Sequence, residues 1–281
     1  METTDSRVSV FCSEQLAARI ERAEAQFMAR CVKSAGGLDG VPGFAFAVAD
    51  GFATYSGPGS PFNKVAGLGF GPLPTVAELA AVEAAYFAEN APVQLELSIL
   101  GDPELGATLT ERGYRLVGFE NVLGRDLRES HGPSVNAAIQ VRRAEGLERE
   151  WMNVVIDAVE HPDTEGVPAH EEFSRGTLER AIEAMVRAGA RQYVALLDQM
   201  VVGGASLRIE GGLAQMTGAA TAPGHRRLGV HAALVAARLS DAADEGCDFA
   251  VVTTQPGSRS HANTQRMGFD LLYSRAILVR G

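Results

Sequence analysis

The sequence is poor in the features that mark several classes of protein. Its three cysteines, Cys12, Cys31 and Cys247, are far apart and form no Cys-x-x-Cys or Cys/His pattern, which argues against a disulfide framework or a structural zinc site. No apolar run approaches the roughly 20 residues that cross a bilayer, and the first five residues lack the basic start of a signal peptide. We therefore expect a cytoplasmic protein without a membrane partner or a bound metal.

Positive charge is also scarce. The 25 Lys and Arg residues are outnumbered by 35 Asp and Glu residues, which gives a net charge of −10. Binding along a nucleic-acid backbone requires an excess of basic residues to pair with the phosphates, so nucleic acid is not an expected partner. The acidic balance suits a weakly cationic substrate, and solubility explains it equally well. With 281 residues the chain is long enough for two domains, each with its own core.

The most informative segment runs from Thr221 to Leu234. It combines the end of an expected strand, a Pro-Gly turn, a short basic loop and the first turn of an Ala-rich helix. Such a loop directs several backbone N–H groups at one point, and the helix N-terminus adds about half a positive charge. The segment therefore predicts a phosphate-binding loop, with an ordinary basic strand-to-helix connection as the alternative.

This segment resembles the acyl-CoA loop of the GNAT superfamily of CoA-dependent N-acetyltransferases, which reads Val-x-Pro-x-x-Arg-x-x-Gly-x-Gly/Ala. The matching residues are Thr221, Pro223, Arg226 and Gly229, and His231 stands where the family has Gly or Ala. Three consequences of that departure stay open: His231 swings outward, donates to a phosphate, or weakens the site. The resemblance implies acetyl-CoA as acyl donor, bound by Ala219, Ala220, Thr221, Arg226, Arg227, Leu228, Gly229, Val230, His231 and Ala232.

The flanking sequence has the same order of elements. We expect an antiparallel meander of three strands at 193–197, 200–209 and 213–221, then a helix that ends at Gly246. A short apolar strand at 249–254, a short helix, a Gly-Phe pair and a strand at 271–279 follow. The resemblance therefore covers residues 141–281.

The first half repeats the plan of the second. Gly113 aligns with Gly268, an offset of 268 − 113 = 155 residues, and residues 122–125 align with 277–280 in the same register. The fold class expected is α/β (α+β), with two GNAT-like domains, each a mixed, mostly antiparallel sheet flanked by helices. The boundaries are 1–130 for a degenerate domain, 131–140 for a linker and 141–281 for the domain with the acetyl-CoA site.

The first copy lacks the phosphate-binding loop. Residues 66–75 contain Gly67-x-Gly69-x-Gly71, but the third glycine comes one position early for a dinucleotide fingerprint and two prolines follow. We interpret this segment as a turn, in a half that shapes the substrate groove. One acetyl-CoA is therefore expected per chain.

Catalysis in this family needs a polarised thioester carbonyl, a route for the amine proton and an acid for the leaving thiolate. The resemblance places the carbonyl at a strand N–H left free where two strands splay, at Ala219, Ala220 or Thr221. The family tyrosine that serves as the acid is replaced by Thr264. Tyr273 is the best substitute, with core packing as the alternative interpretation. Ser258 and Ser260 are the next candidates, with capping of the short helix as their alternative role.

The base is not evident from the sequence. No acidic residue occurs in 213–221, so the base is expected from elsewhere, such as the region between the first two helices of the second half, or acts through water. The candidates from that region, each of which could equally be a solvated surface group, are His161, His170, Glu171 and Glu172. Trp151, which precedes this region, is expected to lie in a helix and to pack in the protein core.

The sequence thus predicts an N-acetyltransferase that moves an acetyl group from acetyl-CoA to the amine of a small molecule. The alternative is a non-catalytic acyl-CoA-binding or regulatory protein, because the usual tyrosine is missing. A monomer and a homodimer both fit.

Overall fold

The computed structural model describes residues 9–35, 43–128, 135–162 and 173–281. Its helices are α1 Glu14–Ala35, α2 Val76–Ala88, α3 Pro103–Glu111, α4 Glu148–Glu160, α5 Arg175–Arg187, α6 Val230–Asp244 and α7 Arg259–Arg266. Its strands are β1 Gly43–Val48, β2 Gly51–Ser56, β3 Lys64–Ala66, β4 Val93–Ser98, β5 Arg115–Asp126, β6 Gln140–Arg143, β7 Arg191–Leu197, β8 Met200–Glu210, β9 Leu213–Thr221, β10 Phe249–Thr254 and β11 Asp270–Arg280.

Local sequence explains where many of these elements begin and turn. Thr75 forms a capping box with Glu78 at the start of α2, which satisfies backbone donors that the helix itself cannot pair. Asp198 and Gln199 both have positive φ between β7 and β8, the backbone that a two-residue hairpin requires. Gly246, with a φ of +77°, follows α6 as expected for a helix C-terminus. The expected meander is confirmed within two residues at each end.

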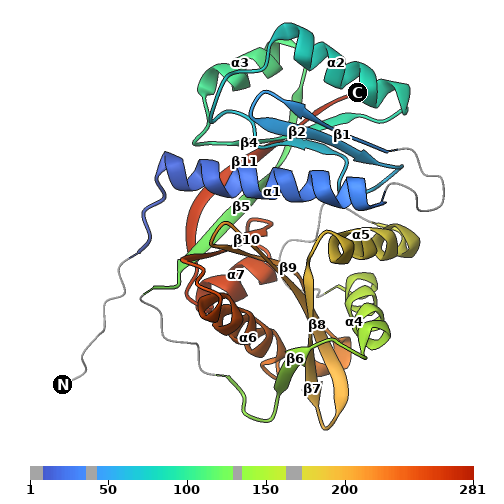
Figure 1. The fold of residues 1–281 in the computed structure, drawn as a ribbon, viewed down its shortest axis with the longest axis vertical. Helices are drawn as coiled ribbons and strands as arrows, with labels where there is room; N and C mark the ends of the chain where they lie inside the picture. The colour runs from blue at the N-terminus through green and yellow to red at the C-terminus, as the bar shows by residue number, and fades with distance from the viewer. Residues whose placement is uncertain (1–8, 36–42, 129–134, 163–172) are drawn as a thin grey trace.

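All strands of the described residues join in one sheet, in the order β1-β2-β3-β4-β11-β5-β10-β9-β8-β7-β6 (Figure 1). The pairs β3–β4 and β9–β10 are parallel, and the other neighbours are antiparallel. The expected mixed, mostly antiparallel sheet is therefore confirmed. Both halves also follow one order, helix, strand, helix, strand, as α2-β4-α3-β5 and as α6-β10-α7-β11.

The two halves exchange their last strands. β11, from the second half, lies between β4 and β5 of the first half, and β5 in turn pairs with β10 of the second half. The division at 131–140 remains a prediction, but the exchange means that neither half completes its own sheet with its own strands.

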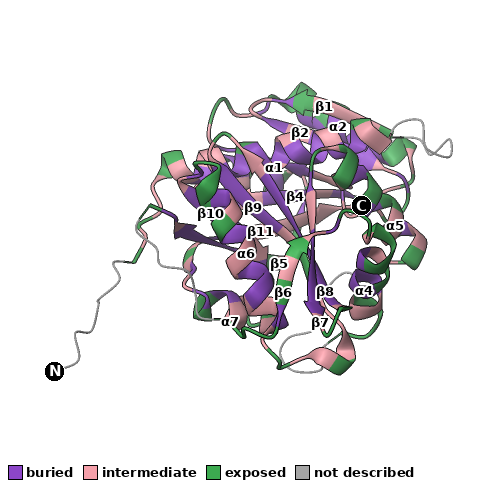
Figure 2. Ribbon diagram, turned by 60° about the horizontal axis from the view of Figure 1, so that its bottom comes forward, coloured by how far each residue is buried: buried purple, intermediate pink, exposed green. Residues whose placement is uncertain are grey.

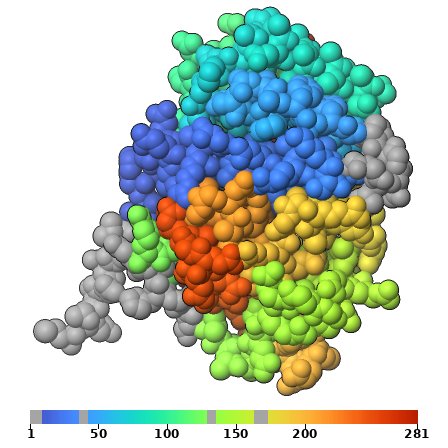
Figure 3. Space-filling model, in the orientation of Figure 1, coloured from blue at the N-terminus to red at the C-terminus, as the bar shows by residue number. Residues whose placement is uncertain are grey.

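Helix α1 crosses the sheet between the halves and forms a continuous band on the surface in the space-filling view (Figures 1 and 3). Ala17 and Ile20 pack against Phe249 and Tyr273, and Phe27 packs with Phe62 and residues of α5. The Arg19 guanidinium also pairs with Asp248, with Nη2 2.6 Å from Oδ1. One helix from the first half thus contacts both halves.

Separate apolar cores lie on either side of this band. One packs α6 against β7 to β10, and the other packs α2 and α3 against β2 and β4. Buried residues accordingly follow the strands and the inward faces of the helices (Figure 2). Trp151 lies in α4, is 1% exposed and donates its indole N–H to Ala205 O, which confirms its expected place in the core.

Candidate functional site

The centre of the second half contains a fork between two parallel strands. β9 and β10 pair only from 213–215 to 249–251, yet β9 continues to Thr221 and β10 to Thr254. Beyond Gln215 the two strands splay. Residues 219–221, which the sequence analysis places at such a splay, follow directly on β9.

A bulge in β9 stands at the mouth of this fork. Against β8, Ala220 pairs with Gly204 and Thr217 with Ser206, so Gly218 and Ala219 have no partner in register. Gly218 has a φ of +55°, the left-handed backbone that glycine adopts without cost. A bulge interrupts the hydrogen-bond ladder, so it leaves backbone groups of this segment unpaired with β8.

Arg238 braces the bulge from α6. Its side chain is buried, and its guanidinium donates to Ser206 O at 2.9 Å, Leu234 O at 3.0 Å and Thr217 O at 3.4 Å. Burial lowers its pKa to about 10, so the side chain stays charged at neutral pH. It fixes the carbonyl groups on both strands beside the bulge.

A first cavity, of about 600 Å³, runs from the fork along the predicted phosphate-binding loop, and we call it the donor groove. On one side lie the predicted residues Ala219, Ala220, Thr221, Arg226, Arg227, Gly229, Val230, His231 and Ala232; on the other lie Arg259, Ser260, Asn263, Arg266 and Met267 of α7 and its end. Leu228, the remaining predicted residue, is exposed and does not line the groove. Four arginines therefore line one groove of an acidic protein.

The loop presents a helix N-terminus to this groove. Gly229 is the N-cap of α6, has a φ of +90° and provides no side-chain cap, so amides of the first turn lack the usual side-chain partner. Arg227 also has positive φ, and the Arg226 guanidinium donates to His161 O at the end of α4. An uncapped helix N-terminus beside arginines is suited to a phosphate group.

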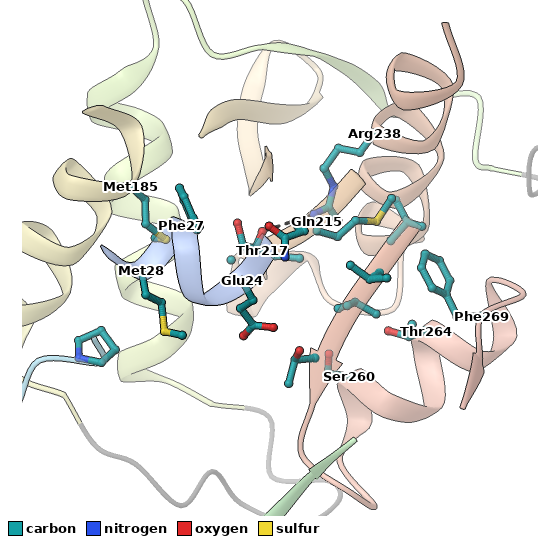
Figure 4. Close-up of a pocket in the computed structure, with 18 of the residues that line it drawn as sticks. Glu24, Phe27, Met28, Met185, Gln215, Thr217, Arg238, Ser260, Thr264 and Phe269 are labelled. Carbon is teal, nitrogen blue, oxygen red and sulfur yellow. Dashed lines mark hydrogen bonds between the residues drawn. The ribbon is translucent and has the colours of Figure 1, made fainter. Parts of the chain in front are cut away.

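A second cavity, of about 330 Å³, continues from the fork toward α1, and we call it the inner cavity (Figure 4). Ala219, His231 and Ser260 line both cavities, so the two meet at the fork. Its apolar lining includes Phe27, Met28, Phe62, Met185 and Phe269, and its polar lining includes Glu24, Lys64, Gln215, Thr217, Ser260 and Thr264.

His231 lies at the junction of the two cavities. Burial, followed by repulsion from Arg238, lowers the pKa of its imidazole to about 4, so the ring is neutral at physiological pH. The sequence left three interpretations of this residue open. A half-buried ring that lines both cavities disfavours the interpretation in which it swings outward.

The two predicted catalytic residues have different surroundings. Tyr273 is 2% exposed, packs with Phe249, and its hydroxyl donates to Glu21 Oε1 at 2.7 Å. It lines neither cavity, so its location gives no support to a role as acid, which stays an untested prediction. Ser260 lines both cavities, and it is Ser258 that caps α7, accepting from His261 N at 3.1 Å.

Of the candidate bases from the region after α4, the structure describes only His161, which lines neither cavity. His161 is exposed at the end of α4, where it pairs with Asp157 at 3.1 Å. His170, Glu171 and Glu172 lie outside the described residues. The carboxylate that does line the inner cavity is Glu24 of α1, which the sequence analysis did not identify.

Glu24 belongs to a buried charge cluster, the Arg275 cluster. The Arg275 guanidinium, 1% exposed, lies 2.6 Å from Glu21, 2.5 Å from Glu24, 3.4 Å from Glu96 and 3.7 Å from Glu120. Lys64 Nζ adds a contact of 2.5 Å to Glu96. The cluster thus holds four carboxylates and two cations.

This surplus of carboxylates affects their ionisation. Burial raises the pKa of Glu21, and burial together with the charge of Glu96 raises the pKa of Glu120 to about 7. For Glu24, burial is outweighed by Arg275, so the pKa is lowered. At neutral pH Glu24 is therefore ionised, while Glu120 is partly protonated.

Neither a membrane span nor a metal centre emerges from the described residues. No helix among them is long and apolar enough to cross a bilayer. Nor do they contain a group of three or more His, Cys, Asp or Glu side chains that could hold a metal ion.

Residues 136–269 match the model of the family described as "Acetyltransferase (GNAT) family". The chain also resembles solved structures over most of its length. A GCN5-related N-acetyltransferase from Kribbella flavida is 21% identical, with a TM-score of 0.63 over 94% of this chain and 95% of that one. One from Sphaerobacter thermophilus is 14% identical, with a TM-score of 0.53 over 92% and 91%.

A third similar structure is a tandem GNAT protein from the clavulanic acid biosynthesis pathway, 14% identical, with a TM-score of 0.56 over 81% of this chain and 73% of that one. No curated protein sequence matches the chain. At these identities the likeness shows the fold alone. Together with the family match, it confirms the GNAT resemblance and the tandem arrangement predicted from the sequence.

Proposed function

We propose that this protein is an N-acetyltransferase that moves the acetyl group of acetyl-CoA to the amine of a small molecule. The observation that carries the proposal is the donor groove, where the fork, the bulge of β9 and the uncapped N-terminus of α6 meet. A GNAT domain at residues 136–269 provides an acyltransferase fold around it.

The groove suits the parts of acetyl-CoA in order. The α6 N-terminus, with Arg226 and Arg227 beside it, would hold the pyrophosphate. The edge of β9 at 219–221, freed by the splay from β10, offers backbone groups to the pantetheine arm. The thioester would then lie at the junction lined by Ala219, His231 and Ser260.

The junction can assist the transfer in two ways. Unpaired amides of the bulge are positioned to stabilise negative charge on the carbonyl oxygen. Ser260 is the hydroxyl that lines both cavities, so it is our candidate for carrying a proton to the thiolate. Overall the amine nitrogen bonds to the acetyl carbon, the carbon–sulfur bond breaks, and of the two protons that an ammonium loses, one ends on the thiol of CoA and one on water.

One observation favours the alternative, a protein that binds acyl-CoA without catalysis. Among the described residues that line the two cavities, no tyrosine is present, and Thr264 occupies the family's tyrosine position. An enzyme of this kind would have to release the thiolate with help from a serine or from water.

Calorimetry with acetyl-CoA tests the donor site, and we expect one molecule per chain. An amine panel with detection of free thiol then separates the two functions. Thiol that appears only when an amine is present supports the enzyme. Binding without thiol release supports the alternative, and absence of binding contradicts both.

A further inference from the structure

We propose that the inner cavity binds the acceptor, and that this acceptor is a compact apolar primary amine whose ammonium group contacts the Glu24 carboxylate. The inference rests on the proposed function and adds the substrate class to it. It also assigns a substrate-binding residue to α1, which is outside the GNAT domain at 136–269.

Position supports this assignment. The inner cavity opens at the fork, where the thioester would lie, and reaches from there to α1 and α5. Figure 4 shows the Glu24 carboxylate entering the cavity from α1, with Met28 on one side and Ser260 on the other. An amine held at Glu24 would therefore lie between α1 and the junction, on the side opposite the donor groove.

The polar groups suit an ammonium. Glu24 is the acidic side chain among the described residues that line the inner cavity. Thr217 Oγ1 is buried there and has no hydrogen-bond partner among the described residues. A buried hydroxyl without a partner is costly, and an N–H donor from a ligand would satisfy it.

The cationic lining residues are already engaged. Lys64 pairs with buried Glu96, and Arg238 donates to three backbone carbonyls. Nearby Arg208 donates to Ala23 O and Gln215 and pairs with Glu210. Because the Glu24 carboxylate is ionised at neutral pH and lines the cavity, an incoming ammonium group meets an opposite charge there and an incoming carboxylate meets a like charge. The charge balance thus favours a monoamine over an amino acid.

The apolar wall and the volume define the rest of the molecule. Phe27, Met28 and Phe62 are buried, and with Met185 they line the end of the cavity away from the donor groove. Ligand pockets span about 300–1,000 Å³, so a cavity of about 330 Å³ lies at the small end. This volume suits a single aryl or branched alkyl group.

The test measures kcat and KM with saturating acetyl-CoA for four probes: phenethylamine, 1,4-diaminobutane, phenylalanine and an alanine-initiated tetrapeptide. We expect the highest kcat/KM for phenethylamine. Glu24→Gln should raise the KM for phenethylamine about tenfold or more, because it removes a charge-assisted hydrogen bond. Glu24→Asp, which keeps the charge, should have a smaller effect, and Glu14→Gln, an exposed change in the same helix, should have none.

Two controls keep the interpretation unambiguous. The affinity of Glu24→Gln for acetyl-CoA, measured by calorimetry, should equal that of the unmodified protein, because Glu24 does not line the donor groove. Its thermal midpoint reports whether losing the Arg275 contact unfolds it, in which case Glu24→Asp carries the test. An unchanged KM in a folded Glu24→Gln protein, or a preference for phenylalanine, overturns this inference and leaves the proposed function intact. No transfer to any amine by the unmodified protein overturns both.

Discussion

Glu120 and Arg275 face each other across the two central strands, and they occupy equivalent positions of the sequence repeat. Their register pairing joins β5 to β11, and 275 − 120 = 155 is the same offset that aligns Gly113 with Gly268. The pair therefore marks a local pseudo-twofold axis in the middle of the sheet. Identical charges opposite each other would destabilise the pairing, and the repeat avoids this with a carboxylate in one copy and a guanidinium in the other.

Removing that guanidinium should damage the fold. Arg275→Met leaves four buried or half-buried carboxylates without their shared partner, and breaking a buried pair costs about 3–5 kcal/mol. We expect a loss of that size in the free energy of unfolding, measured with urea at pH 7. Arg128→Gln, which removes an ion pair whose arginine is 70% exposed, should cost under about 1 kcal/mol. Similar losses for both variants would contradict the proposed importance of the cluster.

The raised pKa of Glu120 predicts a dependence of stability on pH. Its pKa is about 7 in the folded chain against 4.5 for the ordinary group, because of burial and the negative charge of Glu96. The charge of Glu24 raises this pKa further, and the positive charges of Lys64 and Arg275 lower it. The folded state thus holds the proton more tightly, so its stabilising contribution is present below pH 4.5 and is lost as pH rises toward 7. Glu120→Gln cannot ionise. Between pH 5 and pH 8 it should therefore lose less stability than the unmodified protein in urea unfolding, and equal losses would show that Glu120 titrates normally.

Gly229 allows a test of the donor groove with a matched control. Both Gly229 and Gly146 have left-handed backbone, with φ of +90° and +78°, so an alanine at either position should cost about 1–2 kcal/mol of stability. Only Gly229 lines the donor groove. We expect Gly229→Ala to weaken acetyl-CoA binding tenfold or more in calorimetry, and Gly146→Ala to leave it unchanged. If both variants bound acetyl-CoA with equal affinity, the loop at Gly229 would not be part of the acetyl-CoA site.

Arg238 should act as a positioning residue for the bulge. Arg238→Met removes the donors to Ser206 O and Thr217 O, so the amides beside the thioester lose their fixed geometry. We expect kcat to fall more than the KM for acetyl-CoA rises, and Arg238→Lys to recover part of the loss. Arg191→Gln, which breaks an outer ion pair with Glu245, serves as the control. A stability loss with unchanged kcat would limit Arg238 to a structural role.

Tyr273→Phe tests whether Tyr273 is the catalytic acid, as the sequence suggests, or only packs in the core, as its surroundings in the structure indicate. The structure predicts a kcat within a few-fold of the unmodified protein and a stability lower by about 1–3 kcal/mol, because buried Glu21 loses a hydrogen bond. A fall in kcat of about 10²–10⁴-fold, the usual contribution of a general acid, would restore Tyr273 as the catalytic acid.

The phosphate-binding loop, the meander and the repeat could be predicted because each depends on local signals in the sequence. Glycine positions, prolines and apolar periodicity report the backbone of neighbouring residues. The sequence places Tyr273 near the leaving thiolate, with core packing as the alternative, and in the structure its side chain lines neither cavity. β11 has a register shift between Leu271 and Tyr273, and such an irregularity changes which face of a sheet a side chain meets.

Glu24 and the strand exchange could not be predicted. Glu24 reaches the inner cavity only because α1 packs across both halves, which is a long-range contact that helix periodicity does not report. The repeat likewise indicates that both halves have the same elements. It does not indicate which strands β5 and β11 will pair with.

The exchanged strands also set the order in which the protein can fold during synthesis. β11 is made after every other strand of the described sheet, yet its place lies between β4 and β5. Until it emerges from the ribosome, both of those strands have an open edge, and open edges invite pairing with other chains. The sheet of the first half is therefore completed only when the last strand of the second half has been made. An arrest late in translation would leave both halves incomplete and the chain prone to aggregation.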